Sequence, residues 1–290
     1  MATACLSMDH LPLAYGQSHT SKSRVANAHC RSKLRSQSRP SPDRNADRRF
    51  TAMNPVIESL RSLKRLGRAA AGRDLWQTRQ LRIRTLTLGE PDASWTLCPA
   101  RLGPASTVYS LGVGEDISFD LALIERFRLT VHAFDPTPRT IAWLKTQTPP
   151  SEFIFHPWGV AAIDGASRFL PPSDPSNVSH SLLERDTPWP AIEVPVLCLP
   201  TILTLLGHKK IDLLKMDIEG AEYAVIRDLL EAKIEIGQLL VEFHHRWREV
   251  GIEATRQTVR ALNDAGFEIY HVSPRGDEYS FLNTAPGMLP

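Results

Sequence analysis

Apolar positions in residues 95–290 alternate between short continuous runs and longer segments with helical spacing. The runs at 108–112, 130–135, 153–163, 211–217 and 238–243 predict buried strands. Helical spacing occurs at 117–127, 138–145, 221–232 and 255–265, and a closing hairpin is expected at 267–272 and 278–282. Strands and helices that alternate in this order predict an α/β domain with a doubly wound, mostly parallel sheet.

The first 90 residues follow a different pattern. Residues 18–49 are mostly Ser, Arg, Pro, Asn and Asp, which leaves too little apolar surface for a packed core. Asn54-Pro55 resembles a helix start, and apolar residues follow at helical spacing. We therefore expect a disordered basic arm at 1–52, a basic helix and linker at 53–90, and the α/β domain at 91–290. The apolar stripe of the helix is expected to pack on its own domain, and an anionic membrane or nucleic acid is the alternative partner.

A Pro-rich segment at residues 171–190 separates the third predicted strand from the fourth. Loops of this length in a compact domain are often functional, so the segment is a candidate lid. His180 and Ser181 lie within it and are candidate substrate contacts. An ordinary exposed polar loop explains these two residues equally well.

The formal charge of +2 conceals two oppositely charged parts. Residues 1–84 contain 17 Lys or Arg and 5 Asp or Glu, whereas residues 85–290 contain 17 and 27. Because the basic part lies largely outside the predicted domain, its charge does not indicate a nucleic-acid partner. The four cysteines are far apart, and no apolar run reaches the roughly 20 residues of a membrane span. We expect a cytoplasmic protein with no integral membrane contact. The Arg- and Ser-rich start also resembles an organelle transit peptide, which is the alternative.

Two strand ends carry the residues expected at a nucleoside site. Gly112 and Gly114 follow the first predicted strand, where glycines let the backbone approach a ligand closely. Asp135 follows the second strand, 21 residues beyond Gly114, and is placed to accept hydrogen bonds from ribose hydroxyls. A tight structural turn is the alternative interpretation.

The residues beside this loop indicate which nucleoside cofactor is bound. A dinucleotide-binding loop needs a third glycine where Ile117 stands, and the neighbouring Glu115 and Asp116 would repel a pyrophosphate. The same two carboxylates suit a ligand that carries an ammonium and a sulfonium group. This favours S-adenosylmethionine over NAD, although both carboxylates could instead complement the helix dipole. An NAD-dependent oxidoreductase and a non-catalytic nucleoside-binding module are the competing functions.

Residues 211–226 (IDLLKMDIEGAEYAVI) resemble the signature of the FkbM-type methyltransferases, a branch of the class I enzymes that use S-adenosylmethionine. Supporting segments follow in order: GVGED at 112–116, HAFDP at 132–136, GVA at 159–161, VSHS at 178–181 and LVEFHHR at 240–246. The resemblance covers roughly residues 90–285. It implies a Rossmann-like, seven-stranded sheet with the last strand antiparallel, and methyl transfer to a hydroxyl of a sugar or natural product. The commoner loop of the family begins with Asp where Ser110 stands.

The residues after the fourth and fifth predicted strands could carry the chemistry. If the acceptor is a hydroxyl, a base must take its proton, and the candidates are Asp217, Glu219, Glu242, His244 and His245. His244 has a suitable ordinary pKa, so we expect His244, Asp217 and Glu219 to be catalytic. A purely structural role is the alternative interpretation of His244. We expect Glu242 and His245 to contact the acceptor and Asp217 to contact the cofactor as well.

A metal is the alternative use of the same residues. Asp217, Glu242 and His244 form an oxygen-rich set that suits Mg²⁺ or Mn²⁺. Because no two of them have metal-ligand spacing on one element, we expect no metal. Trp158 and Gly159, at the end of the third predicted strand, are candidates for the adenine pocket, whereas Glu222 is expected only to complement a helix start.

Overall fold

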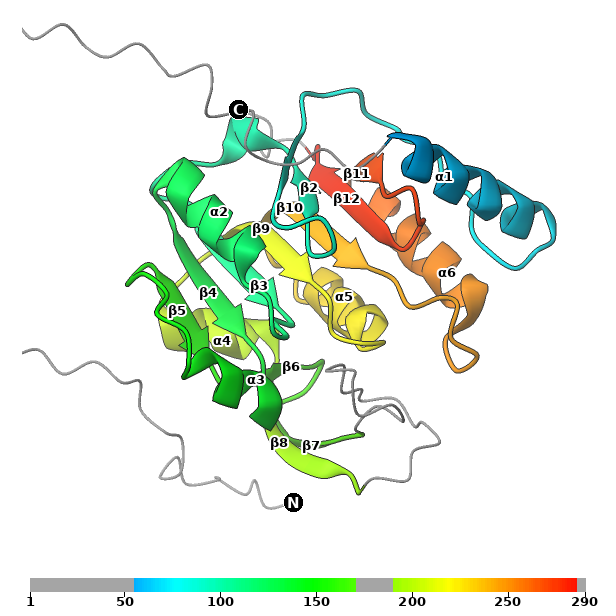
Figure 1. Ribbon diagram of the computed structural model, residues 1–290. Coiled ribbons are helices and arrows are strands. Elements are labelled where there is room, and N and C mark those ends of the chain that lie inside the picture. The colour runs from blue at the N-terminus through cyan, green and yellow to red at the C-terminus, as the bar shows by residue number, and fades with distance from the viewer. Residues whose placement is uncertain (1–54, 171–189, 286–290) are drawn as a thin grey trace, which may run out of the picture. The chain divides into compact units, whose positions relative to one another are not determined.

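Seven strands form one mostly parallel sheet in the computed structural model, which describes residues 55–170 and 190–285 (Figure 1). The strand order is β11-β12-β10-β9-β3-β4-β5. β12 runs antiparallel to β10 and β11, whereas the other neighbours pair in parallel. The predicted doubly wound, Rossmann-like sheet is confirmed. The strands are β3 Thr107–Leu111, β4 Thr130–Phe134, β5 Phe153–His156, β9 Ile211–Met216, β10 Ile236–Glu242, β11 Phe267–Val272 and β12 Glu278–Asn283.

Helices cover both faces of this sheet, as Figure 1 shows. Successive side chains of a strand point to opposite faces. Val108 therefore packs in the core beneath α2, and its neighbour Tyr109 packs in the core beneath α4, α5 and α6. Burial on both faces explains why these strands are almost continuously apolar in sequence. The helices are α2 Ser118–Phe127, α3 Pro138–Leu144, α4 Leu199–Leu206, α5 Glu222–Glu231 and α6 Gly251–Asp264.

The strand expected at 153–163 is interrupted at Pro157, which has no backbone N–H for a sheet ladder. β5 ends at His156, and β6 Gly159–Val160 belongs to a separate three-stranded sheet of order β6-β8-β7. Its other strands are β7 Gly165–Phe169 and β8 Ile192–Leu197. A Cβ at Gly159 would lie 2.8 Å from a side-chain methyl of Val196, its partner in β8, so a larger residue would require Val196 to shift.

Residues before 91 pack against the same core as the residues after it. β1 Leu86–Leu88 pairs with β2 Trp95–Leu97, and Leu88 is buried beneath α2. A 3₁₀ helix, η2 Pro99–Arg101, follows β2. The backbone N–H groups of Gln80 and Leu81 donate to the carbonyl of Ile269 in β11 at 2.7 and 3.0 Å. The expected division between residues 90 and 91 therefore does not coincide with a break in the packing. The arm at 1–52 lies outside the described residues.

The basic helix expected after Asn54 is α1 Pro55–Ala70, but its apolar stripe does not pack on the domain. Leu60, Leu63 and Leu66 are 61%, 66% and 48% exposed, whereas Arg65 on the opposite side of the helix is 5% exposed. The expectation that the leucines face the core is wrong because the surface beneath the helix is polar.

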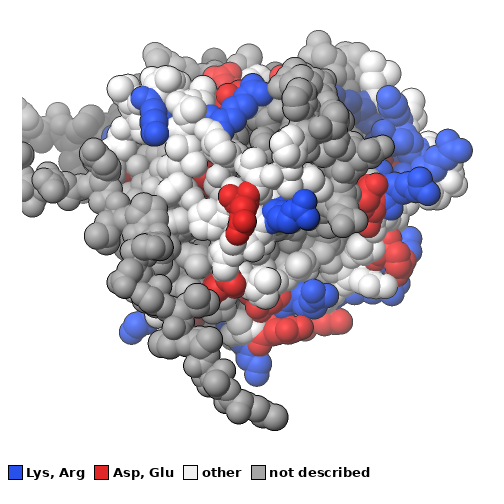
Figure 2. Space-filling view, turned by 90° about the horizontal axis from the view of Figure 1, so that it is seen from below, with Lys and Arg blue, Asp and Glu red and all other residues white. Residues whose placement is uncertain are grey.

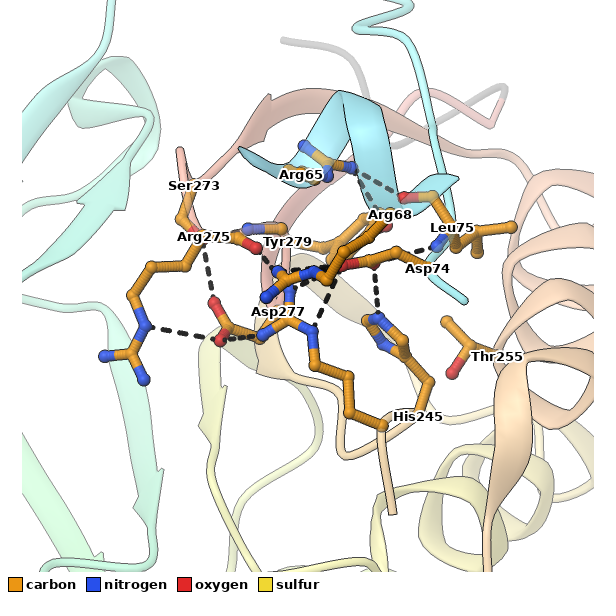
Figure 3. A network of polar contacts seen from close by, with 12 residues as sticks. Arg65, Arg68, Asp74, Leu75, His245, Thr255, Ser273, Arg275, Asp277 and Tyr279 are labelled. Atoms are coloured by element: carbon orange, nitrogen blue, oxygen red, sulfur yellow. Dashed lines mark hydrogen bonds and ion pairs between the residues drawn. The ribbon is translucent and has the colours of Figure 1, made fainter. Parts of the chain in front are cut away.

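That polar surface contains Asp74, whose side chain has no exposed area (Figure 3). Arg68 of α1 pairs with it at 2.9 Å. The guanidinium of Arg65 donates to the carbonyl of Leu75 at 3.0 Å and to the hydroxyl of Tyr279 in β12 at 3.5 Å. A buried carboxylate is costly without cationic partners, so the arginine face turns inward and the leucines point outward. No helix among residues 55–170 and 190–285 is long and apolar enough to cross a bilayer.

Candidate active site

A cavity of about 420 Å³ opens at the carboxyl ends of β3, β4, β9 and β10. β3 lies between β4 and β9, so the strand order reverses at this point, which is where open α/β sheets bind ligands. Trp95, Phe119, Phe134 and Phe169 supply its aromatic lining. The acidic lining residues are Asp92, Glu115, Asp116, Asp120, Asp135, Asp217, Glu219, Glu242 and Glu278.

The loop after β3 forms one wall of the cavity. Gly112 has a φ of +77°, and a Cβ there would lie 1.6 Å from the carbonyl oxygen of Asp217. Glycine is therefore required because the ends of β3 and β9 touch. Lys215 of β9 donates to the carbonyls of Leu111 and Gly112, which fixes the loop from the other side.

Asp135 anchors this loop from β4. Its side-chain Oδ2 accepts the backbone N–H groups of Val113 at 3.1 Å and Gly114 at 3.0 Å. Oδ1 accepts the backbone N–H and the hydroxyl of Thr137, at 2.9 and 2.7 Å. The carboxylate lines the cavity, and its contact with a ribose stays a prediction.

Glu115 and Asp116 both line the cavity but have protein partners. The carboxylate of Glu115 accepts two hydrogen bonds from Arg139, at 3.0 and 2.8 Å. Asp116 accepts the backbone N–H of Ser118 at 2.7 Å, at the start of α2. These contacts favour the structural alternative for both residues over direct attraction of a sulfonium.

Negative charge in the cavity nevertheless suits a cationic cofactor. Lys215 is the one basic residue among the lining residues of this cavity. Asp120, which sequence reasoning missed, is buried beside it, and burial raises the pKa of its carboxyl to about 6. A site with excess carboxylates and an aromatic lining fits a ligand that combines a sulfonium, an ammonium and a flat base.

Asp217, Glu219 and His244 converge at the β9 and β10 side of the cavity. The Nε2 atom of His244 lies 3.4 Å from Oε2 of Glu219 and 3.9 Å from Oδ1 of Asp217. Burial alone would lower the pKa of His244, but the surrounding carboxylates outweigh it and raise the pKa to about 9. His244 therefore favours its charged form at neutral pH and is a poorer base than its ordinary pKa suggests.

Glu222, at the start of α5, orients this cluster. Its Oε1 atom lies 3.1 Å from Nδ1 of His244, and the carboxylate accepts the backbone N–H groups of Ile218 and Gly220 at 3.0 and 2.9 Å. The side chain has no exposed surface. Sequence reasoning gave Glu222 only a helix-terminal role, because its contact with the distant His244 leaves no local signal.

Glu242 and Glu278 face each other in the β10 and β12 pair, and both line the cavity. Burial and the charge of Asp217 raise the pKa of Glu242 to about 8. Burial and the charge of Asp277 raise the pKa of Glu278 to about 7. Glu278 was not among the sequence candidates, since a carboxylate at a hairpin start is common.

His245 is directed away from the cavity and into the polar network under α1 (Figure 3). Its Nε2 atom lies 2.9 Å from Oδ1 of Asp74, and its side chain is fully buried. Adjacent residues in extended backbone point to opposite sides, so His244 and His245 separate. The structure therefore does not support His245 as an acceptor contact.

The remaining candidates are Gly159, Trp158, His180 and Ser181, and the structure describes the first two. Gly159 lines the cavity, whereas Trp158 does not and instead packs near Phe134 and His156. The expected adenine contact of Trp158 is not supported, and Phe169 from β7 lies on the wall instead. His180 and Ser181 lie outside the described residues.

Comparisons with known proteins identify the family of the domain that carries this cavity. Residues 88–269 match the Methyltransferase FkbM domain. The "Probable methyltransferase-like protein 24" of Rattus norvegicus is 26% identical over 174 residues, and that of Homo sapiens is 28% identical over 176 residues. Each alignment covers 57% of this chain and 42% of the relative, so the chain spans less than half the length of these relatives.

Two solved structures are similar at low identity. A fibrillarin of Aeropyrum pernix, in complex with natively bound S-adenosyl-L-methionine, has a TM-score of 0.37 at 12% identity and covers 64% of this chain and 69% of its own. The fibrillarin pre-rRNA processing protein of Methanococcus jannaschii has a TM-score of 0.38 at 14% identity, and the match covers 62% of this chain and 66% of that chain.

The match to the FkbM domain spans more than half of the chain. The chain therefore belongs to the FkbM methyltransferase family.

Proposed function

We propose that this chain transfers the methyl group of S-adenosylmethionine to a hydroxyl oxygen of a small-molecule or glycan acceptor, with Glu242 as the general base. The observation that carries the proposal is the position of Glu242, which lines the cavity and has a pKa raised to about 8. An alcohol ionises far above pH 7, so its proton must leave as the new bond forms. A carboxylate with this pKa is well matched to that transfer.

The cofactor supplies a methyl group bonded to a positively charged sulfur, so the protein mainly has to bind, orient and deprotonate. We assign the cofactor contacts to Gly112, Gly114, Asp135, Gly159 and Asp217, all of which line the cavity. Glu115 and Asp116 contribute negative charge to the cavity, although Glu115 pairs with Arg139 and Asp116 accepts the backbone N–H of Ser118.

The proposed catalytic group still contains Asp217, Glu219 and His244, but His244 is no longer assigned as the base. His244 is absent from the cavity lining, and three carboxylates surround it. We therefore assign His244 to the positioning of Asp217 and Glu219, and Glu242 to proton acceptance. This division follows from which side chains reach the cavity.

The acceptor is proposed to be neither a nucleic acid nor any other extended polyanion. The cavity wall is predominantly acidic, which opposes the entry of a phosphate backbone. Figure 2 shows one face of the molecule, on which described Lys, Arg, Asp and Glu residues are interspersed and the basic residues are densest at the right-hand edge. A cytoplasmic location also stays a proposal.

The test is methylation of small molecules in a cell extract with labelled S-adenosylmethionine and the Glu242→Gln variant. The variant should lose about 10²–10⁴-fold in turnover, because a general base contributes that much, and should bind S-adenosylhomocysteine nearly as tightly as the parent. Full turnover in the variant would refute Glu242 as the base. Exposed Glu231→Gln is the matched control and should methylate as the parent does.

A further inference from the structure

Three side chains at the β9 and β10 ends have the arrangement of a divalent cation site. One ligand atom from each of Asp217, Glu219 and His244 lies within 4.8 Å of the others. Atoms that bind one cation at about 2.0–2.4 Å lie about 3–4 Å from each other. The separations of Nε2 from the two carboxylates, 3.4 and 3.9 Å, fall in that range and exceed an ordinary hydrogen bond.

The histidine is held as metal-bound histidines are. Ligating histidines usually direct their second ring nitrogen to a carboxylate or carbonyl, which fixes the ring. The Nδ1 atom of His244 lies 3.1 Å from the buried carboxylate of Glu222, so Nε2 is the nitrogen directed at Asp217 and Glu219. The side chain of His244 is nine-tenths buried, and no hydrogen bond of its Nε2 atom occurs among the described residues.

Among the described residues, a second atom of the cluster also has no hydrogen bond. Oδ1 of Asp217 is buried and accepts no hydrogen bond within the described part of the chain. Buried carboxylate oxygens normally accept a hydrogen bond, so this atom is available to a further electropositive partner beside His244. Asp217 and Glu219 also line the cavity, which would place that group in reach of an acceptor.

Glu219 reaches the cluster through an uncommon backbone conformation. Its φ is +55°, in the left-handed region that non-glycine residues rarely adopt. Gly220 follows with a φ of +96°, and the buried carboxylate of Glu222 fixes both ends of this turn through Ile218 and Gly220. The turn is thus rigidly supported in a shape that brings Glu219 to His244.

We propose that Asp217, Glu219 and His244 bind one divalent cation at the acceptor end of the cavity. Carboxylates suit Mg²⁺ and Mn²⁺, and an imidazole favours transition ions, so Mn²⁺ fits this set best. Three protein ligands leave positions for water or an acceptor hydroxyl. The cation's role in the reaction rests on the proposed O-methylation: it would bind the hydroxyl oxygen and make its proton easier for Glu242 to remove.

Mn²⁺ binding to the full chain, stripped with EDTA and desalted, tests the site without any methyl acceptor. The free ion is measured by electron paramagnetic resonance during titration. The proposal predicts one saturable Mn²⁺ per chain, displaced by excess Mg²⁺, and at least about tenfold weaker binding in Asp217→Asn and His244→Gln. Exposed Glu231→Gln should bind Mn²⁺ as the parent does. If a thermal melt shows that Asp217→Asn or His244→Gln does not fold, Glu219→Gln is used in place of that variant.

Two results would overturn the site. If Mn²⁺ binding does not saturate up to millimolar concentration, the charge of the two carboxylates is neutralised by protonated His244 and not by a cation. Equal Mn²⁺ affinity in the folded parent and ligand variants would place any bound ion elsewhere. Methyl transfer to a non-oxygen atom with Mn²⁺ binding intact would refute the proposed function and leave the cation site standing.

Discussion

Oε1 of Glu222 lies 3.1 Å from Nδ1 of His244, and this contact joins the start of α5 to the residues after β10. The same carboxylate accepts two backbone N–H groups of the β9–α5 turn. One buried side chain therefore fixes both the turn that carries Asp217 and Glu219 and the histidine that faces them. Its loss should affect stability and the site together.

Glu222→Ala should lower the free energy of unfolding by about 1–3 kcal/mol, because the buried N–H of Gly220 and the part-buried N–H of Ile218 lose their acceptor. Urea denaturation measures the change. Glu231→Gln, exposed at the other end of α5, should stay within about 0.5 kcal/mol of the parent. Equal stability of both variants would contradict the anchoring role of Glu222.

Asp135→Ala should weaken S-adenosylhomocysteine binding by about 1–3 kcal/mol, since the loop at Val113 and Gly114 loses its anchor. Isothermal titration calorimetry measures the affinity, and a thermal melt confirms that the variant is folded. Glu152→Gln, on the exposed turn before β5, is the control. An unchanged affinity in Asp135→Ala would mean that this wall does not hold the cofactor.

The pH dependence of kcat/KM should report Glu242. Burial raises the pKa of its carboxyl to about 8, and only the deprotonated form accepts a proton. The value of kcat/KM should therefore rise about tenfold per pH unit below 8 and level off above it. The folded pKa also exceeds the unfolded one, so the free energy of unfolding attributable to this group decreases as pH rises from about 4.5 to 8. A pH-independent rate would exclude Glu242 as the base.

The polar surface beneath α1 and the exposed leucine face of α1 should differ in their sensitivity to substitution. Asp74→Asn should lower the free energy of unfolding by about 3–5 kcal/mol, because it removes the charge of a buried carboxylate that pairs with Arg68, Arg246 and His245. Leu63→Gln should change it by less than about 0.5 kcal/mol, because Leu63 is largely exposed. Denaturation curves of the two variants measure both values. A large loss in Leu63→Gln would show that the leucine face is packed.

The main sheet was predictable because its strands are buried on both faces, and β4 lies within one residue of the expected range. The third strand was predicted too long because apolar residues continue past Pro157, where only the missing N–H ends the ladder. Helix α1 was predicted correctly as a helix and wrongly oriented. Its periodicity is visible in the sequence, but the buried Asp74 that attracts its arginines is a tertiary feature.

The site shows the same limit. Strand order alone brings Gly112, Asp135 and Asp217 to one edge, so their place at the cavity was predictable. Side-chain pairing determines the roles of the other candidates. Glu115 pairs with Arg139, and His245 pairs with Asp74, and neither pair was predicted from the sequence. Such contacts join residues far apart in sequence and depend on side-chain geometry, which hydrophobic periodicity does not carry.

The central proposal is transfer to oxygen, and the atom that receives the methyl group tests it most directly. The enzyme is incubated with an extract and ¹³C-methyl S-adenosylmethionine, and the labelled product is purified and identified by NMR. The proposal predicts a small molecule or glycan that carries the label as an O-methyl ether, formed by the parent and not by Glu242→Gln. Label on nitrogen, carbon or sulfur, or on a nucleic acid, would contradict it.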